Sequence, residues 1–221
     1  MHATPLQTGT VNAMLINLLY KLTQILIRFI LGLNGGVVVK GRENIPREGG
    51  VIIAANHISY IDPPLIGAVL PRRATFMARK GLFEIPGLRW AMKQTAIPVD
   101  RQRTRPSTIK EAVRRLKKGE VVALFPEGRR SETGELLEGK RGIGMLVSLS
   151  GVPVVPALIT GSDRALPVDA RWLKRARITV VFDKPIYYTS IHEKDYPADL
   201  VYEDITRKIM TSIGELKESC K

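Results

Sequence analysis

Short apolar runs alternate with amphipathic stretches through most of the chain. Runs that are brief and rich in β-branched residues predict buried strands at 37–39, 51–55, 74–78, 96–99, 121–125, 152–159 and 178–182. Helices are predicted between them at 63–70, 87–93, 109–118 and 142–150, followed by an amphipathic helix at 199–216. Strands that alternate with helices are typical of an α/β fold, so we expect a single α/β domain with a mixed, largely parallel sheet flanked by helices.

Helix 109–118 has the clearest boundary signals. Thr108 and Glu111 have the spacing of a capping box, which predicts that the helix begins just after Thr108. Gly119 suits the position that follows the last helical residue.

The segment 11–33 is long and apolar, with one polar stripe. Asn17, Lys21, Gln24 and Arg28 follow one another at helical spacing, and most of the remaining residues are Leu, Ile, Met, Phe or Tyr. A spanning helix would place two cations within the bilayer, at roughly 2.5–3.5 kcal/mol each. A helix lying in the membrane interface would keep the stripe at the headgroups and bury the apolar face.

We therefore expect residues 1–36 to form an amphipathic membrane-interface helix and residues 37–221 to form the α/β domain. Two alternatives stay open: a helix that covers the protein's own core, and a true spanning helix. A secretory signal peptide fits poorly, because no basic segment precedes the apolar part and charged residues interrupt it.

The strand at 51–55 leads directly into segment 56–62, which reads Asn-His-Ile-Ser-Tyr-Ile-Asp. The carboxyl ends of strands are where open α/β sheets place ligand sites. An imidazole base needs a second group to fix its tautomer, and a carboxylate is a common choice. His57 and Asp62 could meet across a turn, although Asp62 also suits a helix N-cap and both residues are compatible with structural roles.

Two other strand ends carry polar groups. Segment 125–131 reads Phe-Pro-Glu-Gly-Arg-Arg-Ser and should emerge at the same edge of the sheet as His57. Its glycine permits close backbone approach, and its arginines supply planar donors that suit phosphate. Segment 97–101 is likewise an apolar piece that ends in an acidic and a basic residue.

Charge narrows the class of partner. The 221 residues carry a net charge of +13, which indicates polyanions such as nucleic acid, anionic lipid headgroups or phosphate-bearing substrates. Aromatic residues make up only 6% and are not interleaved with basic ones, and zinc-ligand spacing and RNA-binding signatures are missing, so no nucleic acid is expected. The single cysteine, Cys220, excludes an intrachain disulfide and suits a reducing compartment.

Four segments together resemble, in order, the motifs of the glycerolipid acyltransferases. They are Asn56-His57-x-Ser59-x-x-Asp62, Pro98-Val99-Asp100-Arg101, Phe125-Pro126-Glu127-Gly128-x-Arg130-Ser131 and Val152-Pro153-Val154-Val155-Pro156. The chain most resembles the 1-acyl-glycerol-3-phosphate acyltransferase family, over roughly residues 38–190. Each motif alone is a weak signal, but four in order with suitable spacing are specific.

The resemblance implies an enzyme of phospholipid biosynthesis. It would transfer an acyl group from acyl-CoA or acyl carrier protein to the sn-2 hydroxyl of 1-acyl-glycerol 3-phosphate (lysophosphatidic acid), which forms phosphatidic acid. The enzyme would be monotopic, on the cytoplasmic face of an anionic membrane, with no metal or other cofactor. An apolar groove near His57 would hold the acyl chain.

The resemblance also implies roles for individual residues. His57 would be the general base, and Asp62 would orient and stabilise its imidazole. The substrate phosphate would be bound by Arg101, Glu127, Gly128 and Arg130, with Lys80 and Arg79 as looser candidates for the same group.

Two positions depart from the family's pattern. Arg129 stands where the family usually has threonine, and Thr95 stands where it usually has glycine. Both concern the acceptor pocket, so a related acyltransferase that uses glycerol 3-phosphate or another lysolipid stays an alternative. A catalytically silent, basic lipid-binding module is a further alternative, against which the intact His57 and Asp62 pair argues.

Overall fold

The computed structural model describes residues 7–100, 106–188 and 197–220, with backbone only for residues 7–13 and 88. Arg101 therefore lies outside the described residues. In chain order the elements are α1 (Gln7–Leu33), β1 (Val37–Lys40), η1 (Arg42–Asn44), β2 (Val51–Ala55), α2 (Asp62–Val69), β3 (Ala74–Arg79), η2 (Lys80–Phe83), α3 (Leu88–Thr95), β4 (Ala96–Val99), α4 (Pro106–Lys117), β5 (Val121–Leu124), α5 (Gly142–Ser150), β6 (Val154–Thr160), α6 (Ser162–Ala165), β7 (Ile178–Phe182) and α7 (Ala198–Ser219).

A seven-stranded sheet forms the centre of the molecule, in the order β1-β7-β6-β2-β5-β3-β4. Strands β6, β2, β5, β3 and β4 run parallel, whereas β7 is antiparallel to β6 and β1 is parallel to β7. The prediction of an α/β fold with a mixed, largely parallel sheet is confirmed. Five parallel strands therefore bring their carboxyl ends to one edge, where ligand sites form in such sheets.

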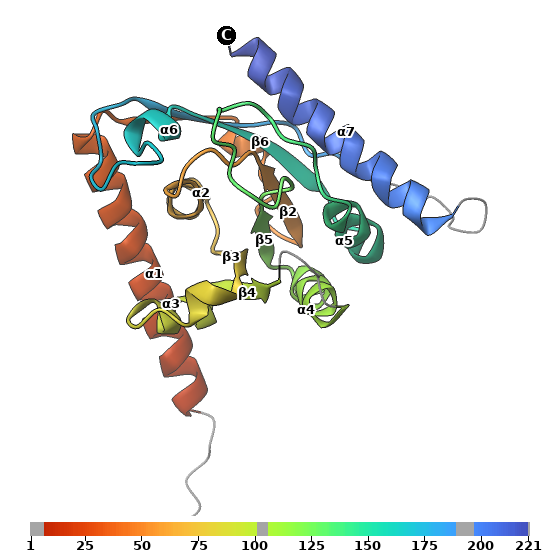
Figure 1. Ribbon diagram of the computed structural model, residues 1–221. Coiled ribbons are helices and arrows are strands. Elements are labelled where there is room, and N and C mark those ends of the chain that lie inside the picture. The colour runs from red at the N-terminus through yellow and green to blue at the C-terminus, as the bar shows by residue number, and fades with distance from the viewer. Residues whose placement is uncertain (1–6, 101–105, 189–196, 221) are drawn as a thin grey trace, which may run out of the picture.

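Both faces of the sheet are covered, as a strand buried on both sides requires. Along β2, Val51 and Ile53 enter one core while Ile52 and Ala54 enter the other. Helices α1 and α2 lie on the first face, and α4, α5 and α7 lie on the second (Figure 1).

Two predicted helix starts are wrong. Asp62 is the first residue of α2 rather than its N-cap, and its carboxylate reaches back to the turn before the helix. Helix α4 begins at Pro106, so Thr108 lies inside it and donates its hydroxyl to the carbonyl of Pro98. Glu111 does not complete a capping box, because its carboxylate accepts hydrogen bonds from Arg114 and Arg115.

Part of the polar stripe of α1 faces the protein rather than headgroups as predicted: Gln24 and Arg28 bind α2, whereas Lys21 is exposed. The Tyr20 hydroxyl and the Gln24 amide donate to the carbonyl of Gly67 at 3.2 and 2.7 Å, and Arg28 Nε donates to the carbonyl of Ala68 at 2.6 Å. These carbonyls belong to the last turn of α2, where a helix has no internal donors. Side chains of α1 therefore satisfy backbone carbonyls at the carboxyl end of α2.

The opposite face of α1 is apolar and exposed. The side chains of Met14, Ile25 and Phe29 are 75%, 63% and 62% exposed, and the segment Met14–Leu33 is long and apolar enough to cross a membrane. Only 6% of that segment is buried, although Leu31 enters the core. The alternative that α1 serves mainly to cover the protein's own core is therefore wrong.

Candidate active site

His57 and Asp62 meet at the carboxyl end of β2, as the turn between them was predicted to allow. His57 Nδ1 lies 2.9 Å from Asp62 Oδ2, and the two residues are 7% and 0% exposed. With Nδ1–H donating to the carboxylate, the other ring nitrogen is left as an acceptor. The pair thus has the geometry of a base and the group that fixes its tautomer.

The Asp62 carboxylate is held by the turn that it closes. Its Oδ2 accepts the backbone N–H groups of Ile58 and Ser59 at 2.8 and 2.7 Å, in addition to His57. The Ser59 hydroxyl donates to the carbonyl of Leu166 at 3.1 Å, so it ties this turn to a distant part of the chain. Three donors on one oxygen fix the position of the carboxylate.

The backbone of His57 is tied to segment 125–131. Glu127 Oε1 accepts the His57 N–H at 2.9 Å, Glu127 Oε2 accepts the Leu137 N–H at 3.1 Å, and Ser131 N–H donates to the His57 carbonyl at 2.7 Å. The His57 ring also stacks on Phe125 with 4.3 Å between centroids. Segment 125–131 therefore positions the candidate base directly.

Glu127 is placed for a structural task rather than for contact with a phosphate. It is only 2% exposed, and both carboxylate oxygens accept backbone N–H groups. Burial raises the pKa of the Glu127 carboxyl, and the N–H donors of His57 and Leu137 oppose that rise.

An apolar cleft opens beside His57, where a groove for an acyl chain was predicted. Its walls come from β3, β4, α4, β5 and α5, through Met77, Val99, Ile109, Leu124 and Ile143. The positively charged residues Arg79 and Lys140 also line it, together with Gly128. The cleft lies where the groove was predicted, and its occupation by an acyl chain stays a prediction.

The Lys140 side chain passes close to the backbone of Gly128. Gly128 has a φ of +68°, and a Cβ atom there would lie 2.8 Å from the Cδ and Cε atoms of Lys140. The positive φ favours glycine at this position, and an added Cβ would also require the flexible Lys140 side chain to shift. Within the described ranges Lys140 has no ion pair, whereas its neighbour Arg141 pairs with Asp199 and Glu203.

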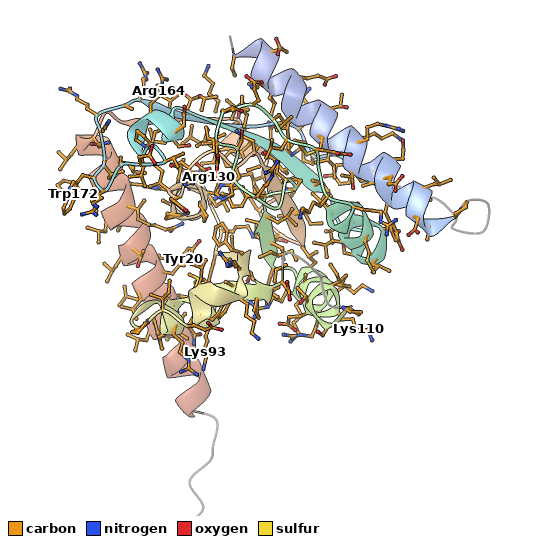
Figure 2. All side chains as sticks on the ribbon, viewed as in Figure 1. Tyr20, Lys93, Lys110, Arg130, Arg164 and Trp172 are labelled. Atoms are coloured by element: carbon orange, nitrogen blue, oxygen red, sulfur yellow. The ribbon has the colours of Figure 1, made fainter. Side chains whose placement is uncertain are left out.

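Arg130 is partly buried and is labelled near the middle of the view in Figure 2. Its guanidinium carbon is 3.8 Å from the centroid of the Tyr60 ring. Its Nε and Nη1 atoms are buried and have no hydrogen-bond partner in the part of the chain that the structure describes. A buried donor without a partner costs about 1–3 kcal/mol, so this guanidinium is suited to an anion.

The remaining predicted residues are spread around the cleft. Arg79 ends β3 and lines the cleft, whereas the neighbouring Lys80 is exposed in η2 and does not line it. Arg129 is exposed, and Thr95 donates its hydroxyl to Ala91 within its own helix. Arg101 cannot be placed, because it lies outside the described residues.

The sequence motifs assign no role to Tyr60 or to Lys140. Tyr60 occupies a variable position of the first motif, and its signal is an exposed aromatic ring between His57 and Asp62. Lys140 follows a segment without regular structure, and its N–H donates to the carbonyl of Pro126 at 2.8 Å, which brings it to the cleft.

Comparisons with known proteins agree with this geometry. Residues 36–160 match the family model described as Acyltransferase. The chain is 33% identical over 171 residues to the 1-acyl-sn-glycerol-3-phosphate acyltransferase of Bacillus subtilis, covering 76% of this chain and 83% of that protein. It is 31% identical over 181 residues to the chloroplastic 1-acyl-sn-glycerol-3-phosphate acyltransferase BAT2 of Brassica napus, covering 80% of this chain but only 50% of the plant protein.

A solved structure shares the whole architecture. The crystal structure of the 1-acyl-sn-glycerophosphate (LPA) acyltransferase, PlsC, from Thermotoga maritima matches with a TM-score of 0.72 at 27% sequence identity, over 91% of this chain and 81% of that one. The family model covers more than half of the chain, and the bacterial relative is matched over most of its length. The chain therefore belongs to the 1-acyl-sn-glycerol-3-phosphate acyltransferase family.

Proposed function

We propose that this protein transfers an acyl group from an acyl thioester to the sn-2 hydroxyl of 1-acyl-glycerol 3-phosphate, which forms phosphatidic acid. The single observation that carries the proposal is the buried His57 and Asp62 pair on the wall of an apolar cleft. Relatives named for this reaction support the acceptor. Acyl-CoA and acyl carrier protein are the two candidate donors.

In the proposed mechanism His57 accepts the proton of the acceptor hydroxyl as the hydroxyl oxygen attacks the thioester carbonyl. The resulting tetrahedral intermediate collapses, the carbon–sulfur bond breaks, and the imidazolium returns the proton to the thiolate. Asp62 stabilises the imidazolium through the 2.9 Å contact with Nδ1. The acyl group passes directly between the substrates.

The substrate phosphate is proposed to bind Arg130, whose buried donors lack partners within the described ranges. Arg79 lines the cleft and is placed to add a second positive charge, while Lys80 and Arg101 stay candidates from the family resemblance alone. Gly128 contributes through its backbone conformation. Glu127 is proposed to act indirectly, by holding the backbone of His57.

The apolar face of α1 is proposed to lie in the membrane interface, with the domain on the cytoplasmic face of an anionic membrane. Gln24 and Arg28 donate to carbonyls of α2, and Asn17 accepts from Arg73, which directly precedes β3. A spanning pose would draw that flank of the domain into the hydrocarbon, so these contacts favour a helix parallel to the surface. Trp172, 84% exposed beside α1, extends the apolar surface (Figure 2).

Reaction and acceptor are tested together. Purified protein in detergent is incubated with 1-acyl-glycerol 3-phosphate and long-chain acyl-CoA, and phosphatidic acid is measured by mass spectrometry. Product that disappears in His57→Ala supports both the reaction and the base. With no product from acyl-CoA or from acyl carrier protein, product from glycerol 3-phosphate or another lysolipid would indicate the alternative acceptor.

Membrane binding is tested by flotation with anionic vesicles. Leu22 on α1 and Leu200 on α7 are 52% and 56% exposed, so Leu→Glu removes the same apolar side chain from two surfaces. We expect Leu22→Glu to reduce vesicle binding and Leu200→Glu to leave it unchanged. Equal binding by both variants would contradict the proposed membrane face.

A further inference from the structure

Tyr60 is an exposed aromatic residue placed between the two members of the His57 and Asp62 pair. Its side chain is 68% exposed, yet one face of the ring lies against the guanidinium of Arg130 at 3.8 Å. The proposed acyl transfer does not involve the Tyr60 ring. An exposed tyrosine over an arginine that is suited to an anion therefore needs an explanation.

The way in which Arg130 is held matters for its chemistry. A carboxylate partner would fix a guanidinium, but it would also occupy N–H donors and cancel the positive charge. An aromatic face attracts the cation from above the plane and leaves every in-plane N–H available for a bidentate anion. In the structure the guanidinium lies against the Tyr60 ring, and its Nε and Nη1 atoms are buried and have no hydrogen-bond partner among the described residues.

The turn that carries Tyr60 is also fixed relative to the base. Its neighbour Ser59 is bound through its N–H to Asp62 and through its hydroxyl to Leu166. On the other side, Ser131, which follows Arg130, donates its N–H to the carbonyl of His57 at 2.7 Å. The ring, the guanidinium and the imidazole are therefore held by short, hydrogen-bonded segments.

We propose that Tyr60 is a positioning residue that sets the preference for a phosphate-bearing acceptor. It holds the plane of the Arg130 guanidinium, so that the N–H donors meet the acceptor's phosphate while its hydroxyl lies at His57. The inference rests on the proposed function, whose acceptor carries the phosphate. Tyr60 acts through Arg130 and does not take part in the chemical step.

The matched variants are Tyr60→Leu, which removes the aromatic face, and Tyr60→Phe, which keeps it. For 1-acyl-glycerol 3-phosphate, Tyr60→Leu is expected to raise KM by roughly five- to thirtyfold with kcat nearly unchanged, and Tyr60→Phe to behave like the unsubstituted protein. Turnover of a monoacylglycerol, which has no phosphate, should be the same in all three. A general structural defect would instead slow both acceptors.

Arg130→Gln completes a double-mutant cycle. If Tyr60 works through Arg130, Tyr60→Leu should have no further effect on KM in the Arg130→Gln background. An unchanged KM in Tyr60→Leu, an equal loss in Tyr60→Phe, or a full Tyr60→Leu effect without Arg130 would each overturn the proposal.

Different measurements test the role of Tyr60 and the proposed function. If the unsubstituted protein forms no phosphatidic acid, the proposed function fails. Equilibrium binding of 1-acyl-glycerol 3-phosphate to detergent-solubilised protein then tests Tyr60 on its own. Weaker binding in Tyr60→Leu but not in Tyr60→Phe supports the positioning role, and equal binding in the three proteins overturns it.

Discussion

Asp62→Asn separates the charge of this residue from its structural contacts. Oδ2 accepts three hydrogen bonds, from His57, Ile58 and Ser59, whereas Oδ1 is buried without a partner among the described residues. Three donors require an oxygen at the Oδ2 position, so the asparagine amide should place its nitrogen where Oδ1 lies. Asp62→Ala would instead leave two buried backbone N–H groups without acceptors, at about 1–3 kcal/mol each, and would confuse folding with catalysis.

The cost of losing the charge follows from the short contact. Nδ1 and Oδ2 are 2.9 Å apart, which places the two charge centres about 4 Å apart. At an effective dielectric constant of about 20, a carboxylate at that separation stabilises an imidazolium by about 4 kcal/mol. The imidazolium of His57 forms during the reaction. Removing the carboxylate charge that stabilises it should therefore lower kcat by about a thousandfold.

The assay is the initial rate of phosphatidic acid formation at saturating acyl-CoA and 1-acyl-glycerol 3-phosphate, with a urea denaturation curve for each protein. We expect Asp62→Asn to lose about three orders of magnitude in kcat, with KM for both substrates nearly unchanged and unfolding almost unaltered. A kcat within tenfold of the unsubstituted protein would refute the electrostatic role. A large loss of stability would refute the assignment of the amide nitrogen.

Three other substitutions test the neighbouring contacts. Glu127→Ala leaves two buried N–H groups unpaired, so the free energy of unfolding measured in urea should fall by roughly 2–6 kcal/mol. Glu127→Gln should lie in between, because its amide has one oxygen and can accept only one of the two N–H groups. No loss of stability would contradict the proposal that Glu127 holds the backbone of His57. Lys140→Gln should raise the KM of a phosphate-bearing substrate by about three- to tenfold, whereas Arg141→Gln, adjacent and equally charged but ion-paired, should not; equal effects would remove Lys140 from the site. Hydrogen bonds from two arginines lower the pKa of Glu111 to about 2, so the stability that it contributes is present above the unfolded pKa near 4.5 and is lost as the pH falls toward 2. For this partly exposed group the contribution is about 0.5–1 kcal/mol. The stability difference between Glu111→Gln and the unsubstituted protein should narrow as the pH falls through about 2 and vanish below it, and a difference that persists well below about pH 2 would contradict the ion pairs.

The sequence predicted what short-range patterns determine. The apolar run at 51–55 is buried on both faces, so it had to be a central strand, and the chain that leaves it delivers His57 to the carboxyl edge. The turn to Asp62 is also local, because the carboxylate reaches N–H groups only three and four residues earlier. The meeting of these two side chains could therefore be predicted before any tertiary contact was known.

Contacts between distant segments could not be predicted from residue types. A glutamate beside two arginines resembles part of a phosphate site, but Glu127 faces the backbone of His57, 70 residues earlier in the chain. Tyr60 and Arg130 show no common pattern in the sequence, although their side chains stack. Helical periodicity predicted the polar stripe of α1 but not the contacts of Gln24 and Arg28, because their partners are carbonyl groups 43 and 40 residues away.

The contacts of Gln24 and Arg28 with α2 have a physical reason if α1 lies in the membrane interface as proposed. In water, the last carbonyls of α2 could be satisfied by solvent, but beside a bilayer a backbone oxygen must find a donor within the protein. Gln24 and Arg28 supply such donors, so their polar groups hydrogen-bond at the junction between α1 and α2. The apolar face of α1 stays free for lipid. Helix α2 has eight residues and is about 12 Å long, and its other end begins with Asp62. The hydrogen bonds from Gln24 and Arg28 therefore satisfy these carbonyls without water. They also fix the position of α2, the helix that begins with the candidate catalytic carboxylate.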